Sequence, residues 1–173
     1  MARDLAQQIH KHNGTLIYGA GSTGIMGELS RTLVSLSGPD AVFGVVPENL
    51  VERERPHDEE AYGRRLIVED IPTRWSIMQA KVTESTTLGS GFVALPGGFG
   101  TLAEVLDVTV DAQIGRHDKP VVAISTGGFF RSLEEQSRMG VEKGMVREEG
   151  AAKLLVVATA EEAMECLFAR SAV

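Results

Sequence analysis

Short apolar runs rich in β-branched residues alternate along this chain with longer stretches of helical periodicity. The predicted strands are residues 15–18, 42–46, 66–69, 91–95, 120–125 and 154–158. The predicted helices are residues 3–12, 25–37, 73–87, 101–115, 129–143 and 160–170. Nearly continuous apolar strands indicate burial on both faces, which is typical of a parallel sheet covered by helices. The alternation therefore predicts a doubly wound α/β fold, in which ligands bind outside the carboxyl ends of the strands.

Length and composition limit the classes of protein to which the chain can belong. A length of 173 residues suits one domain, so we expect residues 1–173 to form a single domain. The net charge of −7 argues against a nucleic-acid or anionic-membrane surface. Because Cys166 is the only cysteine, no disulfide framework is expected, and a reducing, cytoplasmic setting fits. No apolar run reaches the roughly 18 residues of a membrane span, and the N-terminus lacks a signal-peptide pattern.

Residues 95–104 read Leu-Pro-Gly-Gly-Phe-Gly-Thr-Leu-Ala-Glu and join a predicted strand to a predicted helix. The glycines Gly97, Gly98 and Gly100 carry no Cβ, so the backbone N–H groups of the turn can approach an anion closely. Thr101 suits the helix start, where the helix dipole favours phosphate. Glu104 follows one turn later. The segment therefore predicts a phosphate cradle with a carboxylate beside it.

A second glycine-rich loop follows the first predicted strand, in the sequence Tyr-Gly-Ala-Gly-Ser-Thr-Gly at residues 18–24. It matches the G-x-G-x-x-G pattern of dinucleotide sites. That interpretation also needs an acid at the end of the next strand, and Glu48 is a poor candidate because Pro47 is expected to break the strand. Gly21, Ser22 and Thr23 could equally hold part of a mononucleotide, and a tight structural turn remains the alternative.

Two other segments look less regular. Residues 47–64 are polar and rich in charge, which predicts a solvated loop, with a flap over the site as the alternative. Residues 83–91 are rich in Thr, Ser and Gly and predict a helix end followed by a surface turn.

Taken in order, these motifs resemble the LOG ("Lonely guy") family, whose members were long mislabelled as lysine decarboxylases. The resemblance rests on the 18–27 loop, Val45-Val46-Pro47-Glu48, Arg74, the 95–104 motif and His117-Asp118-Lys119-Pro120. It covers nearly the whole chain and implies a Rossmann-like three-layer αβα fold with a mainly parallel sheet. The Gly89-Ser90-Gly91 stretch is similar to fungal members.

The resemblance implies hydrolysis of the N-glycosidic bond of a nucleoside 5′-monophosphate, namely a cytokinin riboside 5′-monophosphate or AMP. The products would be a free adenine-type base and ribose 5-phosphate. Arg74 and Glu104 match the family's catalytic arginine and glutamate. The family also implies a cytoplasmic homodimer with shared active sites and no organic cofactor.

The remaining candidates have plain alternatives. Asp107, three residues after Glu104, could be a second carboxylate of the substrate pocket or a charge on the helix surface. Met78 could line the pocket or belong to the core. The histidines lack partners at metal-ligand spacing, so no metal site is expected. None of the lysines lies in a recognisable pyridoxal-phosphate context, which argues against a true lysine decarboxylase.

The chain also departs from the family pattern. Most members begin with a further strand and a Gly-Ser-Ser loop ahead of the helix that starts here at Arg3. By this resemblance, either the chain is an N-terminally shortened form or another segment fills the gap. A missing inner strand predicts lower stability, a rearranged sheet edge or repair by a partner chain. Trp75 replaces the usual lysine, Ala103 a frequent glutamate and Asp111 a common aromatic residue. These changes are compatible with impaired activity.

The alternative function is a non-catalytic nucleotide- or molybdopterin-binding carrier on the same fold.

Overall fold

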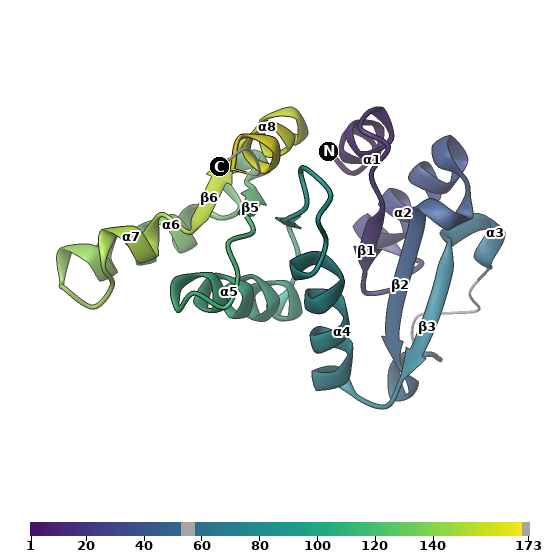
Figure 1. The fold of residues 1–173 in the computed structure, drawn as a ribbon, viewed down its shortest axis with the longest axis horizontal. Coiled ribbons are helices and arrows are strands. Elements are labelled where there is room, and N and C mark those ends of the chain that lie inside the picture. Colours follow the sequence, from purple (N-terminus) through teal and green to yellow (C-terminus); the bar gives the residue numbers. More distant parts are fainter. Residues whose placement is uncertain (53–57, 171–173) are drawn as a thin grey trace. The chain divides into compact units, whose positions relative to one another are not determined.

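The computed structural model describes residues 1–52 and 58–170 and has a mixed α/β fold (Figure 1). Its strands are parallel and form two three-stranded sheets, ordered β1-β2-β3 and β4-β5-β6. This arrangement is consistent with the Rossmann-like three-layer class that the sequence predicts. The chain divides into two compact units, Met1–Lys81 and Val82–Val173.

The first unit is a parallel sheet with helices packed against it. Its strands are β1 (Leu16–Tyr18), β2 (Val42–Pro47) and β3 (Arg64–Val68). Its helices are α1 (Ala2–Lys11), α2 (Gly24–Ser37), α3 (Glu59–Tyr62) and most of α4 (Ile71–Thr83). Strand β2 is central and nearly all buried, which explains its continuous apolar sequence.

The second unit repeats this design with β4 (Phe92–Ala94), β5 (Val121–Ile124) and β6 (Leu154–Val157). Its helices are α5 (Phe99–Gln113), α6 (Arg131–Glu142), α7 (Glu148–Ala151) and α8 (Ala160–Arg170). Every residue of the central strand β5 is buried. Ala123 of β5 packs with Val105 of α5 and with Phe130, whereas α8 contacts β5 and β6. Side chains on the two faces of β5 thus pack against different helices.

The observed elements correct several sequence predictions. Pro47 was expected to break the second strand, but it is the last residue of β2 and pairs in register with Val68. The strand ends there, so the missing proline N–H interrupts no later pair.

Helix α5 begins at Phe99, with Gly98 as its N-cap, rather than at Thr101. Packing of Leu102 and Val105 in the core outweighs the low helix propensity of Gly100.

Two short helices, α3 and α7, were not predicted because four residues are too few to show a helical period. Helix α3 lies inside the predicted 47–64 loop, of which residues 53–57 lie outside the described residues. The predicted turn after α4 is confirmed, and Ser85 Oγ and Ser90 Oγ lie 2.9 Å apart across it.

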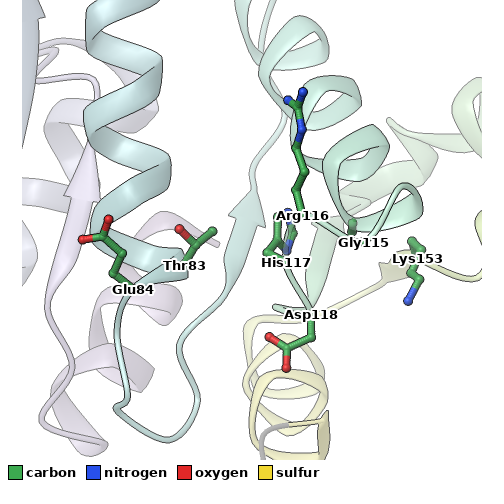
Figure 2. A pocket seen from close by; sticks show the side chains of 8 residues that line it. Thr83, Glu84, Gly115, Arg116, His117, Asp118 and Lys153 are labelled. Carbon is green, nitrogen blue, oxygen red and sulfur yellow. The ribbon is translucent and has the colours of Figure 1, made fainter.

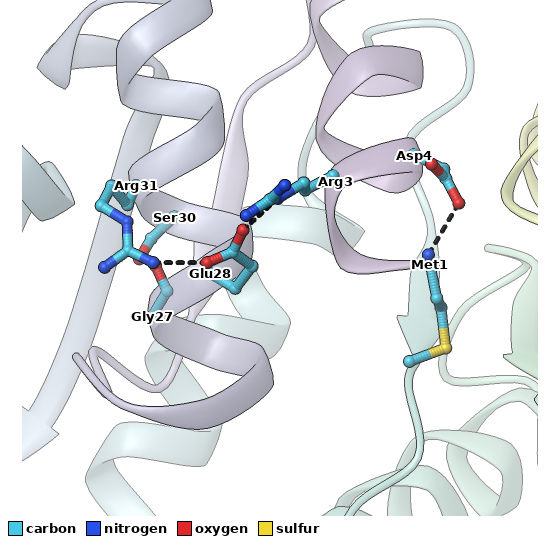
Figure 3. Close-up of polar contacts among 7 residues, drawn as sticks. All are labelled: Met1, Arg3, Asp4, Gly27, Glu28, Ser30 and Arg31. Carbon is cyan, nitrogen blue, oxygen red and sulfur yellow. Dashed lines mark hydrogen bonds and ion pairs between the residues drawn. The ribbon is translucent and has the colours of Figure 1, made fainter.

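Two carboxylates of the first unit are stabilised in their charged form. Arg3 and Arg31 approach Glu28 from two sides (Figure 3), and both side chains hydrogen-bond and pair with it. These two partners lower the pKa of Glu28. At the start of α4, the Oδ1 atom of Asp70 accepts a hydrogen bond of 2.8 Å from the Thr73 N–H. Hydrogen bonds from Thr73 lower the pKa of Asp70.

The Glu28 cluster predicts a pH-dependent contribution to stability. Because its pKa is lowered on folding, Glu28 stabilises the chain above the usual carboxylate pKa of about 4.3, and this contribution is lost as the pH falls through the lowered value. We expect Glu28→Gln to lower the free energy of unfolding at pH 7, and to lower it by progressively less as the pH falls below the usual carboxylate pKa. Urea titrations at a series of pH values from 7 downwards measure this, with Glu135→Gln on α6 as the control. A loss of unfolding free energy that stays the same at every pH would contradict the assignment of this contribution to the charged form of Glu28.

Candidate functional site

The loop between β4 and α5 has the geometry of an anion site. Residues Gly97 to Gly100 are all exposed. The first intrahelical hydrogen bond of α5 runs from the Leu102 N–H to the Gly98 carbonyl, at 3.2 Å. The N–H groups of Phe99, Gly100 and Thr101 thus have no acceptor within the helix, and the positive end of its dipole lies there. An anion placed at this loop would meet these donors.

Internal packing accounts for only one of the three glycines in this loop. The Thr101 side chain lies over Gly97, where a Cβ atom would collide with it. At Gly98 and Gly100 a Cβ atom would meet no described atom within 4 Å. None of the three has a positive φ angle. Neither backbone strain nor crowding within the described chain therefore requires glycine at positions 98 and 100, whereas close approach by an external group would.

Glu104 lies in the second turn of α5, shortly after this loop. Its side chain is half-buried, whereas that of Asp107, one turn further on, is exposed. Both residues interact with other groups of the chain. The exposure of Asp107 favours its interpretation as a charge on the helix surface, although it remains on the same helix as Glu104.

The first glycine-rich loop, residues 19–24, leaves the carboxyl end of β1 and leads into α2. Gly21 is buried, Ser22 is half-buried and Thr23, the N-cap of α2, is exposed. Ala20 has a φ angle of +61°, in the left-handed region that non-glycine residues rarely adopt. Backbone strain of this kind is often found near functional sites.

Arg74 extends from the first turn of α4 to this loop. The three atoms nearest to a Cβ built on Gly19 all belong to the Arg74 guanidinium group, and the Cζ atom is 2.9 Å away. The Nε atom of Arg74 is buried. Both residues stand in motifs that the sequence singled out, but nothing in the sequence indicated that they touch. Met78, one turn along α4, is half-buried, and so is Trp75.

The candidate residues thus form two groups, one in each unit. Arg74 lies with the 19–24 loop in the first unit, and Glu104 lies with the 97–101 loop in the second. Each group follows the carboxyl end of a strand, as the doubly wound pattern predicts.

A separate open pocket lies at the opposite, amino-terminal end of the second sheet. Its lining residues are Thr83, Glu84, Ala112, Gly115, Arg116, His117, Asp118 and Lys153 (Figure 2). The Arg116 and Lys153 side chains diverge in this view rather than converging on one point. Arg116 also pairs with Asp111 at 3.0 Å. Both ring nitrogens of His117 have backbone partners, the Val108 carbonyl and the Lys119 N–H. The pocket wall is therefore better explained by structural contacts than by a binding site.

Residues 1–52 and 58–170 contain no cluster of three or more His, Cys, Asp or Glu side chains arranged to hold a metal ion. Within the same part of the chain, no helix has the length and apolar character needed to cross a membrane.

Comparison with known proteins identifies the family. Residues 26–167 match the family model described as "Possible lysine decarboxylase". A "Bifunctional cytokinin biosynthesis protein" of Fusarium pseudograminearum is 40% identical over 174 residues, which is 96% of this chain but 36% of that protein. The "Probable cytokinin riboside 5'-monophosphate phosphoribohydrolase LOGL2" of Oryza sativa is 34% identical, over 96% of this chain and 64% of that protein.

The "Cytokinin riboside 5'-monophosphate phosphoribohydrolase LOG4" of Arabidopsis thaliana is 34% identical over 96% of this chain and 72% of that protein. The chain thus spans between about one third and three quarters of the length of these three relatives. The family match and the relatives confirm the resemblance that the motifs predicted. The chain belongs to the LOG family, whose model carries the description "Possible lysine decarboxylase".

Proposed function

We propose that this chain hydrolyses the N-glycosidic bond of a nucleoside 5′-monophosphate, releasing a free base and ribose 5-phosphate. The substrates are cytokinin riboside 5′-monophosphates or AMP, and the names of the relatives support the first of these. The observation that carries the proposal is the exposed stretch of residues 97–100, in which a Cβ on Gly98 or Gly100 would meet no described atom within 4 Å, with Glu104 following on the same helix.

In this mechanism the loop binds the substrate phosphate and Glu104 acts at the sugar. Breaking the bond between C1′ and the base nitrogen builds positive charge on the ribose, as in an oxocarbenium ion. A carboxylate close to C1′ stabilises that charge and can orient the attacking water. A carboxylate held on a helix is well suited to this role, because the helix fixes its distance from the phosphate-binding N–H groups.

Arg74 is proposed to bind the phosphate or ribose of the same nucleotide. A guanidinium group can donate two parallel hydrogen bonds to phosphate and remains charged at any physiological pH. Its position over the 19–24 loop supports a role beside Gly21, Ser22 and Thr23, whose amides and hydroxyls can complete nucleotide binding. Met78 is proposed to border the substrate pocket, whereas the exposed Asp107 is assigned as a charge on the helix surface. No organic cofactor or metal enters this mechanism.

The alternative is a non-catalytic carrier of a nucleotide or molybdopterin on the same fold. It is favoured by Trp75 and Ala103, which replace a cation and a carboxylate that the family pattern contains. Retention of both Arg74 and Glu104 favours the enzyme. A carrier needs the phosphate-binding loop but has no use for a carboxylate at C1′, so the role of Glu104 separates the two functions.

We further propose that residues 1–173 act as one nucleotide-binding domain, because the mechanism uses a residue from each compact unit. A cytoplasmic setting is supported by the single cysteine.

We also propose that the protein is a homodimer with shared active sites, and α5 offers a surface that supports this. Its apolar stripe comprises Phe99, Ala103, Leu106, Val110 and Ile114, all exposed. Phe99 is 91% exposed and Ile114 is 60% exposed. The stripe is nearly symmetric about Leu106, so in an antiparallel pair of α5 helices each end would meet the opposite end of its copy. An interface with twofold symmetry requires such self-complementarity.

Replacing the glutamate tests the reaction directly. We expect Glu104→Gln to lower kcat by at least about 100-fold, because the amide cannot stabilise the cationic sugar. AMP binding, measured by calorimetry, should change little. Glu135→Gln on α6 serves as the matched control and should retain full activity. Equal turnover in Glu104→Gln and the unmodified chain would overturn the mechanism, and binding without turnover in the unmodified chain would favour the carrier.

Gly100→Ala separates folding from ligand binding. Alanine has the higher helix propensity and a Cβ there meets no described atom within 4 Å, so the free energy of unfolding should rise by up to about 1 kcal/mol. The added methyl group should nevertheless push the phosphate away from the backbone. Loss of one hydrogen bond to a charged group, worth about 1.5–3 kcal/mol, would raise KM at least about tenfold. A variant that is more stable with unchanged KM would show that phosphate does not approach Gly100.

The oligomeric state can be tested on the apolar stripe. We expect the unmodified chain to sediment as a dimer and the double variant Leu106→Glu, Val110→Glu to sediment as a monomer, because the charges would be buried at the contact. Met139→Glu, an equivalent change at an exposed methionine of α6, is the control and should leave the dimer intact. A dimer that survives the double variant would place the contact elsewhere.

A further inference from the structure

The backbone conformation of Gly19 does not require a glycine at this position. Its φ angle lies outside the positive range, so any residue could adopt its conformation. Gly19 is buried at the end of β1. The space that a side chain would need is occupied by Arg74: from an ideal Cβ, the guanidinium Cζ would be 2.9 Å away and Nε 3.5 Å away. The missing side chain therefore makes room for the guanidinium group.

The next residue shows the opposite arrangement. Ala20 has the left-handed φ angle of +61° that glycine would adopt more easily, yet it carries a methyl group. That methyl group lies against Gly44 of β2, where a Cβ would be only 2.6 Å from it. If conformation alone determined these two positions, the glycine would stand at 20 and the alanine at 19. Conformation therefore does not explain the glycine at position 19, whereas packing does, because the guanidinium of Arg74 fills the space of a side chain there.

The other end of the Arg74 side chain is fixed by the start of α4. The Asp70 carboxylate accepts the Thr73 N–H, and the Asp70 carbonyl accepts the Arg74 N–H at 3.1 Å. These bonds cap the helix and set the direction from which Arg74 leaves it. The guanidinium then lies against Gly19, with its Nε atom buried. Arg74 is thus fixed at its backbone by the start of α4, and its guanidinium group is placed by the contact with Gly19.

We infer that Gly19 is a positioning residue that seats the Arg74 guanidinium at the 19–24 loop. The importance of Gly19 for catalysis rests on the proposed function, in which Arg74 binds the nucleotide. The contact between Gly19 and the Arg74 guanidinium does not depend on that function. Position 19 acts only through residue 74. An alanine at position 19 displaces the end of a flexible side chain and leaves the surrounding backbone in place.

The experiment combines Gly19→Ala with Arg74→Ala in a double-mutant cycle, together with nuclear magnetic resonance of the Arg74 Nε–H group, assigned by its loss in Arg74→Lys. We expect Gly19→Ala to shift the Arg74 signal, to speed its exchange with water and to lower kcat/KM by about 10- to 100-fold. The melting temperature should change by no more than about 2 °C. On the Arg74→Ala background the same substitution should have almost no effect. Gly14→Ala, near Ile9 in the same unit, is the control and should leave the Arg74 signal unchanged.

An unchanged Arg74 signal in Gly19→Ala, or losses of kcat/KM that simply add in the double variant, would overturn the inference. If Gly19→Ala lowers the melting temperature strongly, the inference requires Arg74→Ala to restore it, since removing the guanidinium removes the collision. A failure to restore it would also overturn the inference. Absence of turnover in the unmodified chain would contradict the proposed function instead, and the Arg74 signal would still decide the role of Gly19.

Discussion

The parallel direction of the strands is the constraint on which the rest of this structure depends. All strands within a sheet point the same way, so the segments that follow them emerge at the same edge. The central strands β2 and β5 are buried, and helices connect each strand to the next. The loops that leave β1 and β4 are therefore brought to the edges where a doubly wound protein binds its ligands. Both of these loops are rich in glycine.

Glycine serves two different purposes in these loops. At positions 98 and 100 it leaves open space over exposed backbone N–H groups, which suits an incoming phosphate. At position 19 the space is already occupied by the side chain of Arg74. In the proposed mechanism the first loop acts through the Arg74 side chain that packs against it, and the second through its own backbone. A fixed cation and an array of N–H donors are both contacts that bind phosphate.

The sequence predicted the strands, the long helices and the fold class because their apolar periods are local properties of the chain. It also predicted that Glu104 and the 97–101 loop belong together, since one helix carries both. It could not predict the contact between Arg74 and Gly19, because a glycine in a sequence does not show which side chain fills the space beside it. Pro47 was misjudged for a similar reason: whether a missing N–H matters depends on where the partner strand ends.

The central claim is cleavage between the sugar and the base, and the balance of products tests it most directly. The unmodified chain would be incubated separately with AMP and with isopentenyladenosine 5′-monophosphate, and base, nucleoside, phosphate and ribose 5-phosphate would be quantified by chromatography. Cleavage at C1′ predicts free base and ribose 5-phosphate in equal amounts from at least one substrate, and the relative rates would rank the two. Release of nucleoside and inorganic phosphate, or recovery of both nucleotides intact from a folded protein that binds them, would contradict it.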